Sequence, residues 1–391
     1  MTADRAVQVA LLANPTVQAL YRQVDISQAE LDQASLLVNP VFEASVRFPN
    51  QAGHPANTEF ALSWNLLDLL RRADREELAS TRLRQSRLEV QERLLEVTRE
   101  VKHSFYHVQA LQQTVEQLEI ILRAFEAATE LYGRQHRAGN ISDLDLAQQE
   151  AEVIAARIQL EQTRALLEQA RIQLNLMLGQ APDRELKFGM LADLPEREVA
   201  AEGLEELALN RRPDLHLARL EVEADRQSMA LSSGGLLDEV AIGVSREVEA
   251  DPDHLAVIGP AVEFPVPIFD RKQYEAESFR VKGEQSQRLV EARQLQVRAE
   301  VRVLHSRLLA MRLKVERLRD QLIPKRRQIL RLSRPFYDAM LTGVYTLLEF
   351  RREVASTRLE LIEATEEYWS LRAELEQAVG GPLPDPMERK P

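Results

Sequence analysis

The segment RAGNISDLDLAQQE, residues 137–150, places a glycine and a serine between two long amphipathic patterns. Glycine readily adopts the left-handed conformation that ends a helix, and a serine oxygen accepts hydrogen bonds from the free amides of the next helix. A similar segment, LTGVYTLLEFRREV, occupies residues 341–354. Alignment of Gly139 with Gly343 pairs Ser142 with Thr346, and predicts two equivalent turns with a left-handed glycine and a capping hydroxyl in each.

The sequence on either side of these turns follows one order of elements twice, and such an internal repeat guides the fold more strongly than any local motif. The first repeat, residues 1–200, is predicted to contain a helix interrupted at Pro15, a hairpin at 40–67, a long helix at 68–136, a turn at 137–142, a helix at 142–178 and a connector. The second repeat, residues 201–391, is predicted to contain a helix, a hairpin at 238–269, a long helix at 270–340, a turn at 341–346, a helix at 345–379 and a C-terminal tail.

The two hairpins are predicted from a change of period. Phe42, Ala44 and Val46 alternate with polar residues, which is typical of a strand with one apolar face. Four strands leave two unpaired edges, whereas three copies of the chain supply enough strands for a closed barrel with its apolar face toward lipid. Periodicity alone leaves an alternative open, in which the hairpins are soluble and pack against the helical body.

Composition and charge restrict the class of protein. Charged residues make up 29% of the chain and aromatic residues 5%, with only 14 glycines, which favours long helices over sheets. The net charge of -12 disfavours binding to nucleic acid or to anionic membrane surfaces. Because there is no cysteine, disulfides and thiolate metal sites are excluded. The N-terminal residues lack a signal-peptide pattern, so we expect either a cytosolic protein or a leader absent from this sequence.

No pattern indicates an enzyme or a cofactor. His103 and His107 lie four residues apart and could share a metal ion, but no third ligand is evident, so surface histidines are the favoured interpretation. Asp143 and Asp145 are interpreted as helix-capping residues rather than as an acid/base pair. The sequence contains no phosphate-binding loop and no nucleophile elbow. Pro324 is compatible with either a hinge or a static bend.

Four segments together carry a family resemblance. They are NPVFEASVRF (39–48), RAGNISDLDLAQQEAE (137–152), GPAVEFPVPIFDRKQ (259–273) and LIPKRRQILRLSRPFYDAMLTG (322–343). With the duplication, residues 5–381 resemble the TolC-like outer membrane efflux family, in particular the outer-membrane factors of heavy-metal and multidrug tripartite pumps. The resemblance implies a mainly α fold with a long-helix α-barrel, and a homotrimer whose hairpins form one 12-stranded β-barrel in outer-membrane lipid.

The resemblance also implies a function and its residues. The chain would be the passive exit duct of an efflux or type I secretion system, extending into the periplasm, where its turns meet an adaptor protein coupled to an inner-membrane transporter. The implied docking residues are Gly139, Asn140, Ile141, Ser142, Gly343, Val344, Tyr345 and Thr346. The implied periplasmic constriction contains Asp145, Glu349 and Arg352, and the arginine argues against a strongly cation-attracting ring. The alternative function is a soluble, elongated coiled-coil scaffold that uses its hairpins for protein interactions.

Overall fold

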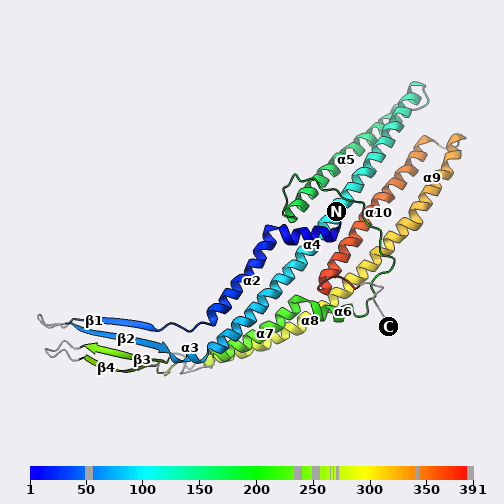
Figure 1. Cartoon of the computed structure of the whole chain (residues 1–391). Coiled ribbons are helices and arrows are strands. Elements are labelled where there is room, and N and C mark those ends of the chain that lie inside the picture. The colour runs from blue at the N-terminus through cyan, green and yellow to red at the C-terminus, as the bar shows by residue number, and fades with distance from the viewer. Residues whose placement is uncertain are drawn as a thin grey trace. The chain divides into compact units, whose positions relative to one another are not determined.

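The computed structural model describes residues 1–48, 56–232, 240–248, 256–264, 266, 268–269, 273–339, 341 and 343–384 (Figure 1). The elements of the first repeat are α1 (Ala3–Ala13), α2 (Pro15–Ala34), β1 (Val41–Arg47), β2 (Asn57–Asn65), α3 (Leu66–Leu70), α4 (Arg72–Arg137) and α5 (Asp143–Met177). Those of the second are α6 (Leu204–Arg211), α7 (Pro213–Ser232), β3 (Ala241–Val248), β4 (Ala256–Glu263), α8 (Gln273–Arg317), the π-helical turn η2 (Leu318–Leu322), α9 (Ile323–Asp338) and α10 (Val344–Val379). The predicted element order is therefore confirmed.

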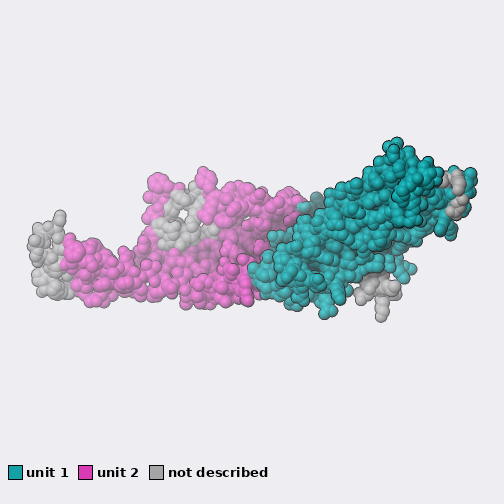
Figure 2. Space-filling view, turned by 90° about the horizontal axis from the view of Figure 1, so that it is seen from above, with its two compact units in different colours: residues 1–19, 92–212, 295–391 teal, residues 20–91, 213–294 magenta. Residues whose placement is uncertain are grey.

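The chain folds into two compact units (Figure 2). Unit 1 consists of residues 1–19, 92–212 and 295–391, and unit 2 of residues 20–91 and 213–294. Each unit contains segments from both halves of the sequence. The boundary between repeats at residue 200 stays a prediction. Within the described residues, no helix has the length and apolar character needed to cross a membrane.

Unit 2 contains a four-stranded antiparallel sheet in the order β1-β2-β3-β4. The register pairs Phe42 with Leu62, Leu62 with Val244 and Val244 with Pro260, so one face is largely apolar across all four strands. The predicted alternation is thus confirmed. The fourth strand ends at Glu263, short of the Phe269 expected from sequence, and Pro265 and Pro267, which lie outside the described residues, have no amide hydrogen with which to extend a strand ladder.

Unit 1 has two hydrophobic cores, one for each repeat. The core of the first repeat joins α1, α4 and α5 and includes Val101, Phe105 and Leu174. The core of the second repeat joins α6, α8 and α10 and includes Leu308 and Tyr368. Both follow the spacing of three and four residues that places apolar side chains on one face of a helix, as at Val101 and Phe105.

Three helix boundaries refine the predictions. α1 ends at Ala13 and α2 begins at Pro15, which confirms the predicted interruption. The segment predicted as one helix over 270–340 is divided by the π-helical turn η2, and Pro324 lies in the first turn of α9. Leu322 and Ile323 both have helical dihedral angles, so η2 continues directly into α9, and Pro324 has no amide hydrogen to donate within that continuous helix. α10 ends at Gly380, whose φ of 83° is the left-handed conformation expected at this position.

Candidate functional site

The first turn is closed by its own side chains and backbone. Gly139 has a φ of 75°, as predicted. The Ser142 hydroxyl accepts a hydrogen bond from the Asp145 amide at 3.2 Å, while the Asp145 carboxylate accepts one from the Ser142 amide at 3.3 Å. These reciprocal bonds form a capping box. The predicted capping role of Asp145 is confirmed, and its carboxylate is committed to the helix start.

The second turn contradicts the predicted equivalence. Gly343 has a φ of -73°, not a positive value, and it precedes α10 as an N-cap residue without a side-chain hydrogen bond. Thr346 lies inside the first turn of α10, so it does not cap the helix as Ser142 does. Five residues separate α4 from α5, and five separate α9 from α10. When Gly139 is aligned with Gly343, however, the second connection begins three positions earlier than the first. The aligned glycines therefore occupy different places in their turns.

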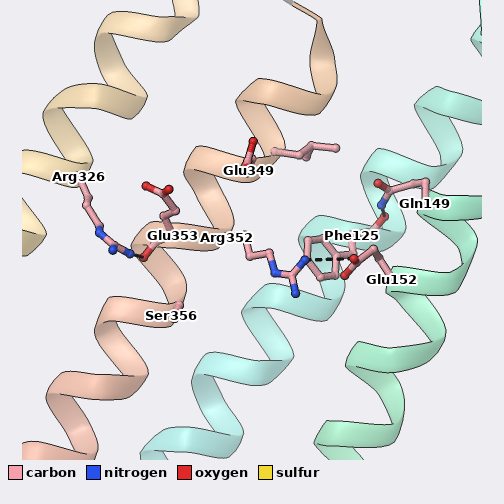
Figure 3. A pocket seen from close by; sticks show the side chains of 9 residues that line it. Phe125, Gln149, Glu152, Arg326, Glu349, Arg352, Glu353 and Ser356 are labelled. Carbon is pink, nitrogen blue, oxygen red and sulfur yellow. Dashed lines mark hydrogen bonds and ion pairs between the residues drawn. The ribbon is translucent and has the colours of Figure 1, made fainter. Parts of the chain in front are cut away.

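A pocket of about 390 Å³ lies among α4, α5, α9 and α10 in unit 1 (Figure 3). Glu349 and Arg352 of α10 both line it, and their assignment to a constriction stays a prediction. Asp145 is not among the described lining residues. The remaining lining residues are Phe125, Gln149, Glu152, Arg326, Leu348, Glu353 and Ser356. The pocket thus combines side chains from both repeats, with α4 and α5 facing α9 and α10.

An ion pair crosses this pocket. The Arg352 Nη1 atom lies 3.0 Å from the Glu152 Oε1 atom, and thereby joins α10 to α5. Both side chains are substantially exposed, so the pair contributes at most about 1 kcal/mol. The lining holds three carboxylates, Glu152, Glu349 and Glu353, against the guanidinium groups of Arg326 and Arg352. The lining is therefore mixed in charge, and the expected effect of Arg352 on cation attraction stays a prediction.

The sequence did not reveal Glu152 as a site residue. It lies on an amphipathic helix among several other exposed acidic residues, and nothing in its local pattern distinguishes it. Its role depends on which helix faces α5, and that information belongs to the tertiary fold. The sequence does contain basic residues that could pair with Glu152, but their charge alone does not show which of them is its partner.

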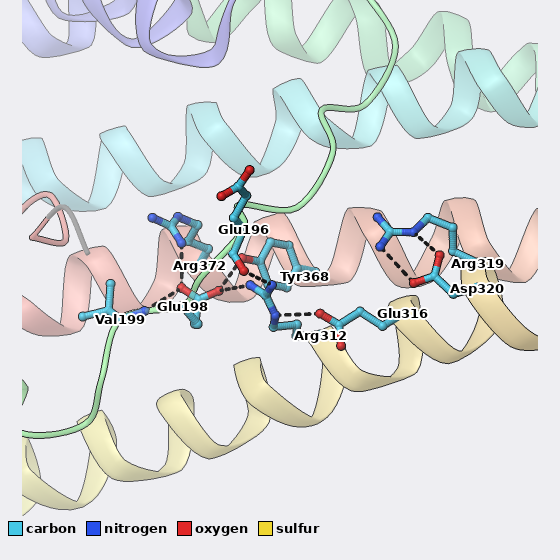
Figure 4. Close-up of polar contacts among 9 residues, drawn as sticks. All are labelled: Glu196, Glu198, Val199, Arg312, Glu316, Arg319, Asp320, Tyr368 and Arg372. Atoms are coloured by element: carbon cyan, nitrogen blue, oxygen red, sulfur yellow. Dashed lines mark hydrogen bonds and ion pairs between the residues drawn. The ribbon is translucent and has the colours of Figure 1, made fainter. Parts of the chain in front are cut away.

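The connector between the repeats is held by a buried carboxylate (Figure 4). Only 5% of the Glu198 side chain is exposed. It accepts hydrogen bonds from the Tyr368 hydroxyl and, at 2.7 Å, from Arg372 Nη1. Arg312 of α8 forms an ion pair with it at 3.6 Å. One acidic residue of the connector therefore joins α8 to α10.

Burial and charge alter the acid-base properties of this cluster. Burial, together with the hydrogen bond to Glu198, raises the pKa of the Tyr368 hydroxyl, which stays protonated and acts as a donor. Burial by itself would lower the pKa of Arg372, but the negative charge of Glu198 reverses that effect and raises it. The Tyr368 hydroxyl and the Arg372 guanidinium group therefore both act as donors to Glu198 and anchor the connector.

The two histidines have separate partners. His103 Nδ1 lies 3.0 Å from the Ser370 hydroxyl, and His107 Nδ1 lies 2.6 Å from the Glu366 carboxylate. The hydrogen bond to Glu366 raises the pKa of His107. No group of three or more metal-binding side chains occurs among the described residues. Both histidines contact α10, and His103 is exposed, as expected for a surface histidine.

The fold matches solved outer-membrane proteins over nearly its whole length. The Campylobacter jejuni CmeC outer membrane channel is 14% identical, with a TM-score of 0.81 over 97% of this chain and 85% of that chain. The Vibrio cholerae outer membrane protein VceC is 16% identical, with a TM-score of 0.75 over 97% of this chain and 96% of that chain. The hairpins and paired long helices of this chain therefore have the same fold as these two proteins.

The chain belongs to the outer membrane efflux protein family, whose model matches residues 6–180 and 204–381. A curated relative, the cobalt-zinc-cadmium resistance protein CzcC of Cupriavidus metallidurans, is 28% identical over 290 residues. The aligned region covers 70% of this chain and 64% of the relative's length. The family consists of efflux channels rather than enzymes, and it disfavours the soluble-scaffold alternative.

Proposed function

We propose that this chain is the outer-membrane exit duct of a tripartite efflux or type I secretion system. It acts as a homotrimer that extends into the periplasm and conducts cargo passively from a periplasmic adaptor and an inner-membrane transporter. The observation that carries the proposal is the single four-stranded sheet, in a member of the efflux family, with a continuous apolar face. Such a sheet is a fragment of a barrel rather than a finished structure.

The edges of the sheet support a ring of three copies. β1 and β4 are its outer strands, and among the described strands β1 pairs only with β2 and β4 only with β3. Exposed edges invite pairing with another chain. Three copies provide twelve strands, which suffice for a closed barrel. The apolar face is well exposed, since Phe42 and Ile258 keep 66% and 67% of their surfaces accessible, and lipid is the environment that such a face requires.

Assembly can be tested with the purified full-length chain in a neutral detergent. We expect a trimer by mass and a conducting pore in planar bilayers. Replacement of Phe42 and Ile258 by aspartate should prevent insertion, because charges on a lipid-facing strand surface are unfavourable. Aspartate at Ser45 and Ser245 is the matched control, because both residues point to the polar face. A monodisperse monomer without detergent would contradict the proposal.

The two turns are proposed as the adaptor-docking surface. Gly139, Asn140 and Ser142 are exposed at the end of the α4–α5 pair, and Gly343 and Thr346 lie at the end of the α9–α10 pair. The turn residues Val344 and Tyr345 belong to the same proposed surface. Because the chain has no cysteine, Asn140→Cys provides a single cross-linking site, which should capture the adaptor in cells. Gln148→Cys, on an exposed position of α5, should capture much less.

The constriction is proposed at the pocket that contains Glu349 and Arg352, with Asp145 nearer the turn. Arg352→Glu should repel Glu152 and change both conductance and ion selectivity of the trimer in bilayers. The double variant Arg352→Glu/Glu152→Arg restores the opposite charges, so it should recover the conductance of the unmodified protein. Equal conductance of all three proteins would remove these residues from the constriction.

Divalent metal cations are the cargo to test first, because the relative CzcC is a cobalt-zinc-cadmium resistance protein. A strain that lacks its own copy of this chain should become sensitive to these metals and recover when the chain is restored. Retention of full resistance without the chain would direct the search to organic cargo or to secreted protein, while the assembly tests would be unaffected.

A further inference from the structure

A second pocket in unit 1 lies among α4, α9 and α10 and has a volume of about 370 Å³. Its floor is apolar and includes Ile120, Ile121, Phe125, Leu330, Leu348 and Ala355. Ile120 keeps 46% of its surface exposed, so the described part of the chain leaves this floor partly uncovered. The volume falls within the range of about 300–1,000 Å³ that is common for small-molecule sites.

Four arginines surround this apolar floor: Arg327, Arg351, Arg352 and Arg358. Arg352 is paired with Glu152. Among the described residues, the other three guanidinium groups make no ion pair within 4.0 Å. No aspartate or glutamate is among the described residues that line the pocket. The positive charge over the floor is therefore left uncompensated.

The neighbouring pocket at the constriction provides an internal contrast. The two pockets share Phe125, Leu348 and Arg352, but only the constriction pocket is lined by carboxylates. The pocket with Glu152 is therefore mixed in charge. The pocket among α4, α9 and α10 combines an apolar surface with arginines that form no ion pair with described residues. Only the second has the chemistry to select an anion.

We propose that the pocket among α4, α9 and α10 binds a small amphiphilic organic anion. The apolar body of the ligand covers Ile120 and Ile121, and its sulfonate, carboxylate or phosphate group accepts hydrogen bonds from Arg351 and Arg358. Guanidinium groups suit such oxyanions because they donate parallel hydrogen bonds to two oxygens. A ligand in this position contacts the first repeat through α4 and the second through α9 and α10, so it would hold the two together.

The test uses the full-length trimer in a neutral detergent and two probes of equal ring size. Equilibrium dialysis against protein-free micelles measures binding of naphthalene-1-sulfonate and of uncharged 1-naphthalenemethanol. We expect saturable binding of the sulfonate and at least about tenfold weaker binding of the alcohol, because one charge-assisted hydrogen bond is worth roughly a factor of ten in affinity. Equal binding of the two probes would overturn the proposal.

Three variants locate the site. Arg351→Gln/Arg358→Gln should weaken sulfonate binding by about tenfold or more, and Ala355→Phe should abolish it by filling the pocket while every arginine remains. Arg331→Gln is the control, because Arg331 is an exposed arginine of α9 that does not line the pocket. The proposal is overturned if the control weakens binding as much as the pocket variants do. It is also overturned if no probe binds because a neighbouring copy or a partner helix covers the pocket.

Discussion

The two arms that carry the turns have the same architecture and opposite charge. The first arm, residues 119–154, has seven acidic and three basic residues, a net charge of -4. The second arm, residues 323–358, has three acidic and eight basic residues, a net charge of +5. The first turn is capped by Ser142 and Asp145, whereas no side chain caps the second. The two arms therefore share a helix-turn-helix architecture but differ in net charge and in the capping of their turns.

The same contrast appears where the connector meets the cores. Its first part is held on the first repeat by neutral amides: Asn175 donates to the carbonyl oxygens of Pro182 and Arg184, and Gln109 donates to that of Gly189. Its second part is held on the second repeat by the Glu198 cluster. The second repeat also donates a neutral hydrogen bond, from Trp369 Nε1 to the Ala192 carbonyl oxygen, but it adds the buried charge of Glu198, and each anchor can be removed separately.

The largest effect is expected from Glu198→Ala. It leaves Arg312 and Arg372 with little solvent and without their shared carboxylate, and loss of one partner from a buried ion pair costs about 3–5 kcal/mol. Calorimetry should show a clear fall in Tm. Gln109→Ala, which removes a neutral anchor of the first repeat, should lower the Tm less. A larger fall in Tm for Gln109→Ala than for Glu198→Ala would show that the neutral anchor of the first repeat stabilises the fold more than the buried charge of the second.

Proline substitutions should have different effects in the two turns. Gly139→Pro is incompatible with a φ of 75° and removes the hydrogen bond from the Gly139 amide to the His136 carbonyl oxygen, a cost on the order of 3 kcal/mol. Gly343→Pro fits the observed φ of -73°. Export should be lost in the first variant and largely retained in the second, with trimers formed by both. Loss of export in both would show that the second turn needs its glycine for another reason.

Loss of the capping hydroxyl should have a smaller, local effect. Ser142→Ala removes the acceptor for the Asp145 amide and should cost about 1 kcal/mol. Hydrogen exchange should become faster in the first turn of α5. Thr346→Ala is the matched change in the second repeat and should leave exchange in α10 unaltered, because Thr346 does not cap that helix. Equal acceleration in both helices would restore the equivalence predicted from sequence.

The smallest effect concerns pH. The hydrogen bond to Glu366 raises the pKa of His107 above its ordinary value, so protonated His107 stabilises the folded state. This contribution is complete below a pH of about 6.5, the value for an unfolded chain, and is lost as pH rises through the raised pKa. His107→Gln should therefore lower the Tm at mildly acidic pH and have little effect at alkaline pH. His103→Gln, which removes the contact with the uncharged Ser370 hydroxyl, is the matched control.

The sequence predicted most of the fold because its repeating periods arise from local geometry. The alternation around Phe42 and the intervals of three and four around Val101 and Phe105 identify elements without knowledge of their neighbours. The capping box at Ser142 was predictable for the same reason, since all its atoms lie within four residues. Pro15 likewise ended α1 through its own covalent structure.

The remainder depended on tertiary contacts. Glu198 lies in a connector with no regular pattern, and its importance arises from Tyr368 and Arg372, more than 160 residues away. Glu152 became a site residue only through Arg352 of the other repeat. The second turn was predicted wrongly because its similarity in sequence was taken as similarity in backbone, although helix α10 begins three positions earlier than the alignment with Ser142 implied.

The π-helical turn η2 determines which face of α9 is buried. Upstream, the buried residues Val297, Val301, Leu304 and Leu308 follow intervals of three or four, but Leu318 and Ile323 are both buried at an interval of five. The wider turn accommodates one additional residue, so Ile323 returns to the buried side. A regular α-helix through this segment would rotate everything beyond it by about 100°. Arg326 and Arg327, which line the two pockets, owe their orientation to that single extra residue.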